Sequence, residues 1–257
     1  MDSSTQSTVF NIPKLKLSSS SGHLNMPVIG LGCAVDKCLR CAVDKSDTDA
    51  LKLVVLEAIK LGYRHFDTAA MYGTEKALGE AIAEALRLGL VSSREQLFIT
   101  SKLCALQMEY LDLYLVHWPI SSKPGELGFP EPKEDLLPMD YRGVWEAMEE
   151  SQMLGLTKSI GLSNFSRKKI ETILTFATIP PSINQVSLRW IVEQGATVVI
   201  KSLNLERMKQ NLGIFDWKLT DDDYDKINQI PQHRLIPSDF WVSPQGPFKT
   251  LEELWDD

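Results

Sequence analysis

The stretch Gly62-Tyr-Arg-His-Phe-Asp67-Thr-Ala-Ala-Met-Tyr72-Gly-Thr-Glu75 spans the passage from a predicted strand into a predicted helix. We expect a strand over 64–68 and, after a short loop, a helix over 75–88 that Thr74 caps and Gly89 ends. Asp67 then stands at the carboxyl end of the strand, and Tyr72 lies in the loop that follows. In parallel α/β folds this edge of the sheet carries the reactive side chains.

The same alternation of strand and helix continues along the whole chain. Further strands are expected at 28–32, 97–102, 111–117, 159–163, 182–186 and 198–201, and further helices at 46–61, 141–154, 167–177, 188–194, 206–212 and 221–229. This order predicts parallel βαβ units, and therefore an α/β doubly wound sheet or barrel. No G-x-G-x-x-G follows a strand, which disfavours a dinucleotide-binding Rossmann domain and favours a (β/α)8 TIM barrel.

We expect a single domain over 1–257, in which 1–27 form an N-terminal tail and hairpin and 231–257 a C-terminal loop and tail. Two joins disturb the barrel pattern. Only 103–110 separates two predicted parallel strands, although such a pair needs a crossover of about a dozen residues. Near Gln185 a strand runs directly into a helix-like stretch. Seven candidate strands, against the eight or so that close a TIM barrel, predict an incomplete barrel that lacks one strand and several helices.

The bulk composition is that of a soluble globular protein, with 44% hydrophobic and 24% charged residues among 257. A net charge of -7 disfavours a nucleic-acid partner. No stretch is apolar and long enough to cross a bilayer, and the N-terminus has no secretory signal pattern. We therefore expect no membrane partner and a cytoplasmic location.

The four cysteines are Cys33, Cys38, Cys41 and Cys104, too few for a disulfide scaffold. Cys38 and Cys41 have the C-x-x-C spacing of redox and zinc sites, which leaves a redox or zinc protein as one hypothesis. However, there is no second cysteine pair. The two residues also lie in a small duplication in which 33–37 is nearly repeated at 41–45. We expect a loop here and no metal.

Several reactive side chains stand at or just past predicted strand ends: Asp67, Lys102, His117, Asn164 and Lys201. Such a set suits carbonyl reduction by a nicotinamide, which needs a held hydride donor and a proton for the forming alkoxide. Tyr72 can give the proton if its pKa falls from about 10. Lys102 is the cation that would lower it, and Asp67 would orient that ammonium. Each residue alone has an ordinary reading, such as a helix cap or a core histidine, but together they match one reaction.

Five sequence blocks resemble the aldo-keto reductase family, in order and over nearly the whole chain. They are 62–75, Phe98-Ile-Thr-Ser-Lys102-Leu, Leu111-Asp-Leu-Tyr-Leu-Val-His117-Trp-Pro119, Ser159-Ile-Gly-Leu-Ser163-Asn164-Phe and Ile200-Lys201-Ser202. The C-terminal stretch from Ile236 to Asp257 resembles plant members of the family, the chalcone (polyketide) and codeinone reductases.

The resemblance implies an NADPH-dependent enzyme that reduces a small aldehyde or ketone and acts as a monomer. It implies a catalytic tetrad of Asp67, Tyr72, Lys102 and His117. The cofactor would lie against Asp67, Ser163, Asn164, Gln185, Lys201, Ser202, Arg207 and Asn211. Within that set, Ser163, Asn164 and Gln185 would bind the nicotinamide carboxamide. Lys201, Ser202 and Arg207 would bind the 2′-phosphate, and Asn211 the adenine. The substrate would lie against His117, Trp118 and Trp241.

This chain also departs from the family pattern. Cys104-Ala-Leu-Gln stands where the family has a full helix. A strand with a ring that stacks on the nicotinamide, and a loop over the pyrophosphate, are absent between Gln185 and Val186. Both losses predict weaker cofactor binding and exposed strand edges. Two functional hypotheses therefore stand beside the redox one: an active reductase, and a catalytically impaired or inactive relative with a non-enzymatic role. The sequence does not identify the carbonyl substrate.

Overall fold

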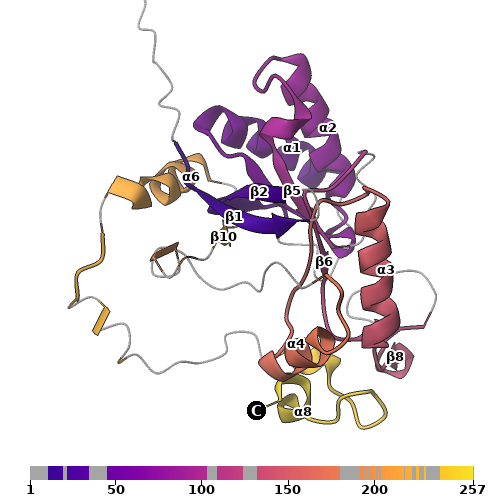
Figure 1. Cartoon of the computed structure of the whole chain (residues 1–257). Helices are drawn as coiled ribbons and strands as arrows, with labels where there is room; N and C mark the ends of the chain where they lie inside the picture. The colour runs from indigo at the N-terminus through magenta and orange to yellow at the C-terminus, as the bar shows by residue number, and fades with distance from the viewer. Residues whose placement is uncertain are drawn as a thin grey trace, which may run out of the picture.

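The fold is described from a computed structural model (Figure 1). Six parallel strands form one sheet, in the order β10-β3-β4-β5-β6-β9. The structure describes residues 11–19, 22–34, 45–102, 109–123, 132–179, 192–193, 195, 197–200, 202, 204–216, 218–221, 224–225, 229 and 238–256. The strands are β3 (Ile29–Gly32), β4 (His65–Asp67), β5 (Phe98–Ser101), β6 (Leu113–Val116), β9 (Ile160–Leu162) and β10 (Val198–Ile200).

Neighbours in this sheet follow chain order from β3 to β9, and the last strand, β10, then pairs with the first, β3. A strand sequence that returns to its own beginning is that of a barrel, because an open doubly wound sheet places its first strand in the interior and reverses direction there. The structure therefore confirms the barrel prediction. Within the described residues β9 and β10 are the two edge strands of the sheet and do not pair with each other. This gap is expected for a barrel that lacks strands.

Helices α1 (Lys45–Leu61) and α2 (Glu75–Arg87) cover the outer face of β3, β4 and β5. Leu51, Val55 and Ala58 of α1 and Leu78 of α2 belong to the same buried cluster as Phe66 of β4. Side chains alternate along a strand, so Phe66 faces the helices while its neighbours face the barrel interior. Each such side chain contributes roughly 1.5–3 kcal/mol by leaving water.

An antiparallel hairpin closes one end of the barrel interior. It consists of β1 (Lys14–Ser19) and β2 (Gly22–Pro27), as predicted for this region. Leu17 and Met26 from the hairpin pack with Phe98, Leu113 and Leu115, which point inward from β5 and β6. Because the hairpin fills the amino-terminal end of the strands, the carboxyl ends form the open end.

Strand β6 keeps its parallel pairing with β5 despite the short connection between them, with Thr100 level with Leu113. One buried carboxylate helps to hold it there. Asp112 accepts a hydrogen bond from the Ile99 backbone at 2.9 Å and forms ion pairs with Arg94 at 2.8 Å and Lys158 at 3.0 Å. Asp112 immediately precedes β6, so these partners tie the start of that strand to β5 and to the segment that leads into β9.

The other side of the molecule is built by α3 (Tyr141–Met153) and α4 (Arg167–Leu174), which pack against β9. The segment between β6 and α3 contains a two-residue antiparallel pair of β7 (Ser121–Ser122) and β8 (Leu136–Leu137). The C-terminal region, expected to be loop and tail, contains a short helix, α8 (Leu251–Trp255). Both elements are too short to leave a periodic pattern. Within the described residues, no helix meets the length and hydropathy that a membrane crossing requires.

Candidate active site

Asp67 and Lys102 form a buried ion pair at the open end of the barrel. Asp67 is the last residue of β4, and Lys102 follows β5, the adjacent parallel strand. The Lys102 ammonium donates to the two Asp67 carboxylate oxygens at 2.8 and 3.0 Å and to the Thr68 carbonyl at 3.2 Å. The lysine side chain is 3% exposed and the aspartate side chain 8%.

Tyr72 lies beside this pair. The Lys102 nitrogen is 5.3 Å from the centroid of the Tyr72 ring. Burial alone would lower the pKa of Lys102, but the Asp67 carboxylate and hydrogen bonding to Tyr72 outweigh it, so the pKa is raised. Lys102 therefore carries its charge throughout the physiological range, next to the Tyr72 hydroxyl.

A tight turn sets the position of Tyr72. The turn is a 3-10 helix over Ala70–Tyr72, and Gly73 ends it in the left-handed region with φ 63°. This conformation favours glycine. Thr74 was predicted to cap α2 with its side chain, but it makes no such bond. Its hydroxyl instead lies 3.2 Å from that of Thr68, which ties the turn back to the end of β4.

His117 follows β6 and faces Tyr72 across the open end. The two rings are 5.8 Å apart between centroids and nearly perpendicular, at 82°. Burial, with a smaller contribution from the Lys102 charge, lowers the pKa of His117 to about 3. The imidazole is therefore neutral at physiological pH, so it can donate a hydrogen bond without carrying a charge.

Ser163 and Asn164 follow β9, the next strand. Asn164 has a left-handed backbone, with φ 60°. Its amide nitrogen donates to the His117 carbonyl at 2.9 Å and to the Ser163 hydroxyl at 3.1 Å. The side chain of Asn164 is thereby fixed beside the histidine, and its amide oxygen has no partner among the described residues.

Three more predicted cofactor residues lie at or near α6 (Leu205–Leu212), which follows β10. Ser202 is buried, and its hydroxyl donates to the Asn204 carbonyl at 3.1 Å. Arg207 is exposed in the first turn and has no ion-pair partner among the described residues. Asn211 lies one turn later, near the Tyr63 hydroxyl, which itself donates to the Met208 carbonyl at 3.2 Å. A helix start with a free guanidinium suits an anion.

Some predicted residues lie outside the described part of the chain. These are Gln185, Lys201, Cys38, Cys41 and Cys104. Cys33 is buried, and its pKa is raised by burial and by the nearby Asp67 charge, so it is an unreactive thiol. Among the described residues, no group of three or more histidine, cysteine, aspartate or glutamate side chains could hold a metal ion.

An aromatic cluster borders the tetrad on the side of the C-terminal segment. The Trp118 ring is 6.3 Å from that of His117 and 5.7 Å from that of Trp241. Phe240 and Trp255 complete the cluster, each with its ring centroid 6.1 Å from that of Trp118. Trp255 was not predicted as a site residue. The signal that could have indicated it is the helical spacing of the apolar residues Leu251, Leu254 and Trp255.

The model of one protein family matches the chain in three overlapping parts, over residues 42–105, 103–188 and 180–232, and its description is "Aldo/keto reductase family". The chain belongs to the aldo/keto reductase family. The family match confirms the resemblance found in the sequence. The members of this family are oxidoreductases.

Curated relatives agree with this assignment. The chain is 42% identical to "NADPH-dependent codeinone reductase 1-4" of Papaver somniferum and 44% identical to "NAD(P)H-dependent 6'-deoxychalcone synthase" of Glycine max. In both cases the match covers 96% of this chain and 98% of the relative. The alignments run over 324 residues, whereas this chain has 257, so segments of the relatives have no counterpart here.

Two solved structures have the same fold. The chain is similar to a Bombyx mori aldo-keto reductase in complex with NADP, with a TM-score of 0.74 and 27% identity over 90% of this chain and 97% of the other. It is also similar to an aldose reductase from Schistosoma japonicum, with a TM-score of 0.78 and 26% identity over 93% and 99%. The fold is thus the family's barrel in an incomplete form.

Proposed function

We propose that this protein reduces an aldehyde or ketone to the alcohol with NADPH as hydride donor, and that Tyr72 gives the proton. One observation carries the proposal: Asp67, Lys102, Tyr72 and His117 converge from three adjacent strands at the open end of the barrel. Family membership supports the reaction class, and the names of relatives such as the codeinone reductases support the cofactor.

The described residues fit the cofactor at two separate points. Beside β9, the free amide oxygen of Asn164 and the hydroxyl of Ser163 can bind a carboxamide. At α6, Arg207 and Ser202 can hold a phosphate next to a helix amino terminus, and Lys201, which lies outside the described residues, would add a second cation. Gln185 would complete the first set and Asn211 the second. When bound, NADPH supplies the hydride.

The chain's own residues supply the proton and stabilise the charge that develops. As the substrate oxygen gains charge, the Tyr72 hydroxyl gives it a proton. The phenolate that remains is stabilised by the Lys102 ammonium, which is held in place by the two contacts to Asp67. A cation fixed before the reaction costs no reorganisation when the charge appears.

His117 orients the carbonyl in this proposal. Because its pKa is about 3, it approaches the substrate as a neutral donor and does not compete with Tyr72 as an acid. Its position is supported by Asn164, which holds the His117 carbonyl. Trp118 and Trp241 offer apolar surface for the rest of the substrate.

We further propose that 1–257 form one domain that acts as a cytoplasmic monomer. The four tetrad residues come from one chain, so catalysis needs no residue from a partner. The scarcity of cysteine and the single buried thiol among the described cysteines suit a reducing compartment.

The test uses the purified full chain with reactive aldehydes and either NADPH or NADH. We expect consumption of NADPH, a preference for it over NADH that Arg207→Ala removes, and loss of turnover in Tyr72→Phe with cofactor binding retained. The shorter length of this chain favours one alternative, a catalytically impaired or inactive relative with a non-enzymatic role. Folded, unmodified protein that neither binds NADPH tightly nor consumes it would support that alternative, and turnover that survives Tyr72→Phe would refute the assigned proton donor.

A further inference from the structure

A buried lysine on α4 is held by the C-terminal segment. Lys169 is 6% exposed. Its ammonium donates to the carbonyls of Leu254 at 2.9 Å and Glu253 at 3.3 Å, and it pairs with the Asp256 carboxylate at 2.5 Å. The ring of Phe248 lies 5.2 Å from the same nitrogen. A lysine is seldom fully buried unless it is paired, and every partner named here belongs to the last residues of the chain.

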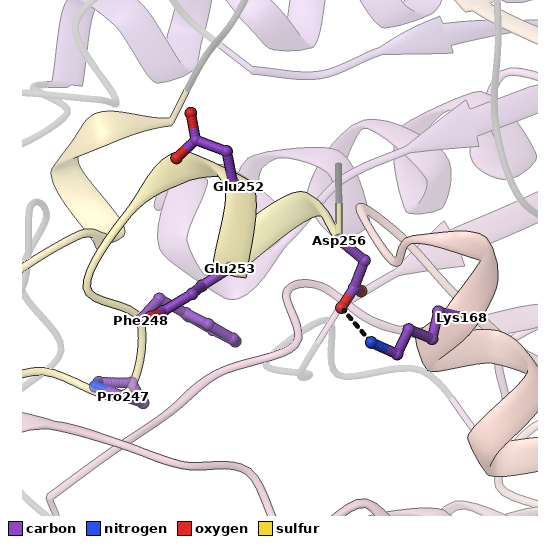
Figure 2. Close-up of a pocket in the computed structure, with 6 residues that line it drawn as sticks. All are labelled: Lys168, Pro247, Phe248, Glu252, Glu253 and Asp256. Carbon is purple, nitrogen blue, oxygen red and sulfur yellow. Dashed lines mark ion pairs between the residues drawn. The ribbon is translucent and has the colours of Figure 1, made fainter.

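Asp256 is the ion-pair partner of Lys169 and also contacts other residues of α4. Its backbone is left-handed, with φ 60°, where it ends α8. Its carboxylate accepts a hydrogen bond from Ser166, the N-cap of α4, and also pairs with Lys168 at 3.7 Å (Figure 2). Burial opposes its ionisation, but the bonds from Lys169 and Ser166 outweigh this and lower the pKa of Asp256. The Asp256 side of the contact is therefore ionised at neutral pH.

The short helix between these anchors carries part of the aromatic cluster beside His117. Leu254 is 1% exposed and belongs to the same buried cluster as Trp241. Trp255 lies next to Trp118, the residue that follows His117. A helix of this length has no stability of its own, so the place of Trp255 depends on what holds its ends.

The surface around the contact is open to solvent. A hollow there is lined by Lys168, Pro247, Phe248, Glu252, Glu253 and Asp256, and Figure 2 shows Lys168 reaching the Asp256 carboxylate at its edge. None of the tetrad residues lines it. In Figure 1, α8 lies against α4 near the end of the described chain. The hollow therefore gives solvent access to Lys168 and Asp256, whereas Lys169 is buried beneath the C-terminal segment.

We propose that Lys169 is a positioning residue for substrate selection: it anchors the C-terminal segment so that Trp255 and Trp118 form an apolar wall beside His117. This wall favours carbonyl compounds that carry a large aromatic group. A small aldehyde reaches the tetrad without touching it. The inference rests on the proposed reductase function and adds the substrate class that the site prefers.

The experiment compares Lys169→Met with Lys168→Met in the full chain, using naphthaldehyde and propanal at saturating NADPH. Lys168 is the matched control, because it reaches the same carboxylate but its side chain is 78% exposed. We expect Lys169→Met to raise the KM for naphthaldehyde about tenfold or more, the scale of a lost charge-assisted anchor. The kcat for propanal and the affinity for NADPH should stay as in the unmodified protein. Trp255→Ala should reproduce the KM change, and Lys169→Arg should largely restore it.

A purely structural role would lower activity on both aldehydes in proportion to the loss of folded protein, and that result would overturn the proposal. Equal KM values for naphthaldehyde in the two methionine variants would overturn it as well. If the unmodified protein oxidises no NADPH with either aldehyde, the proposed function has failed. The anchoring role of Lys169 is then tested separately, by measuring the hydrogen-exchange protection of the backbone amides at 251–255. Protection lost only in Lys169→Met supports the anchor, and equal protection in both variants refutes it.

Discussion

Replacing Asp67 with asparagine removes the negative half of the buried pair that organises the site. The Lys102 ammonium loses a carboxylate that contacts it at 2.8 and 3.0 Å and keeps the Thr68 carbonyl at 3.2 Å. With the lysine side chain 3% exposed, water cannot replace what is lost. Breaking a buried pair in this way typically costs about 3–5 kcal/mol. We expect about 3 kcal/mol for Asp67→Asn, because the amide oxygen still accepts one bond.

The catalytic consequence follows from the same geometry. Without Asp67, burial acts on Lys102 unopposed by its main partner, so the pKa of Lys102 falls and the ammonium is no longer fixed beside Tyr72. Removing one preorganised electrostatic contact to a developing charge costs roughly a hundredfold or more in kcat. NADPH affinity should change less, because the cofactor contacts proposed at Asn164 and Arg207 remain.

The assays are urea denaturation for the free energy of unfolding and NADPH consumption for kcat. Asp135→Asn is the matched control. Asp135 pairs with Lys123 at a comparable 3.0 Å, but these side chains are 37% and 54% exposed. An exposed pair of this kind contributes little. If Asp67→Asn costs no more stability than Asp135→Asn and leaves kcat unchanged, the pair does not organise the site.

Three further predictions concern the barrel interior. The pH profile of kcat/KM should show no His117 inflection between about pH 5 and 8, since its pKa is about 3; an inflection lost in His117→Gln would contradict this. Burial lowers the pKa of His65 to about 4, below its unfolded value of about 6.5. Stability should therefore fall as the pH drops from about 6.5 to 4, by about 3 kcal/mol, and His65→Gln should flatten this dependence in acid titrations followed by circular dichroism. Gly30→Ala places a methyl 2.6 Å from the His65 ring and should cost about 1–3 kcal/mol in thermal unfolding; an unchanged melting temperature would show that the ring can move.

The long elements were predictable because their signals are local, and the meeting of Asp67, Lys102 and His117 was predictable from the order of the strands that carry them. The helix over 75–88 appears as α2 at Glu75–Arg87, and the strand over 64–68 as β4 at His65–Asp67. Asp67, Lys102 and His117 follow successive parallel strands, and the carboxyl ends of such strands meet at one edge. Their convergence therefore follows from strand order alone.

Other features depend on contacts between distant parts of the chain. The Asp112 ion pairs, which join residues from three segments, help to hold the parallel pairing of β5 with β6 across a short connection. The helix α8 depends on Lys169, far away in sequence. The Thr74 side chain bonds to Thr68 and not to the helix that it precedes. Propensity and periodicity carry no information about partners of this kind.

The central claim, that this incomplete barrel transfers a hydride to a carbonyl carbon, is tested most directly by isotope transfer. The unmodified protein is mixed with a reactive aldehyde and NADPH that carries deuterium in the transferable position, and the alcohol is analysed by mass spectrometry. We predict alcohol with deuterium on its carbinol carbon, and none from Tyr72→Phe under the same conditions. Cofactor bound to folded protein, with no labelled alcohol formed, would contradict the claim.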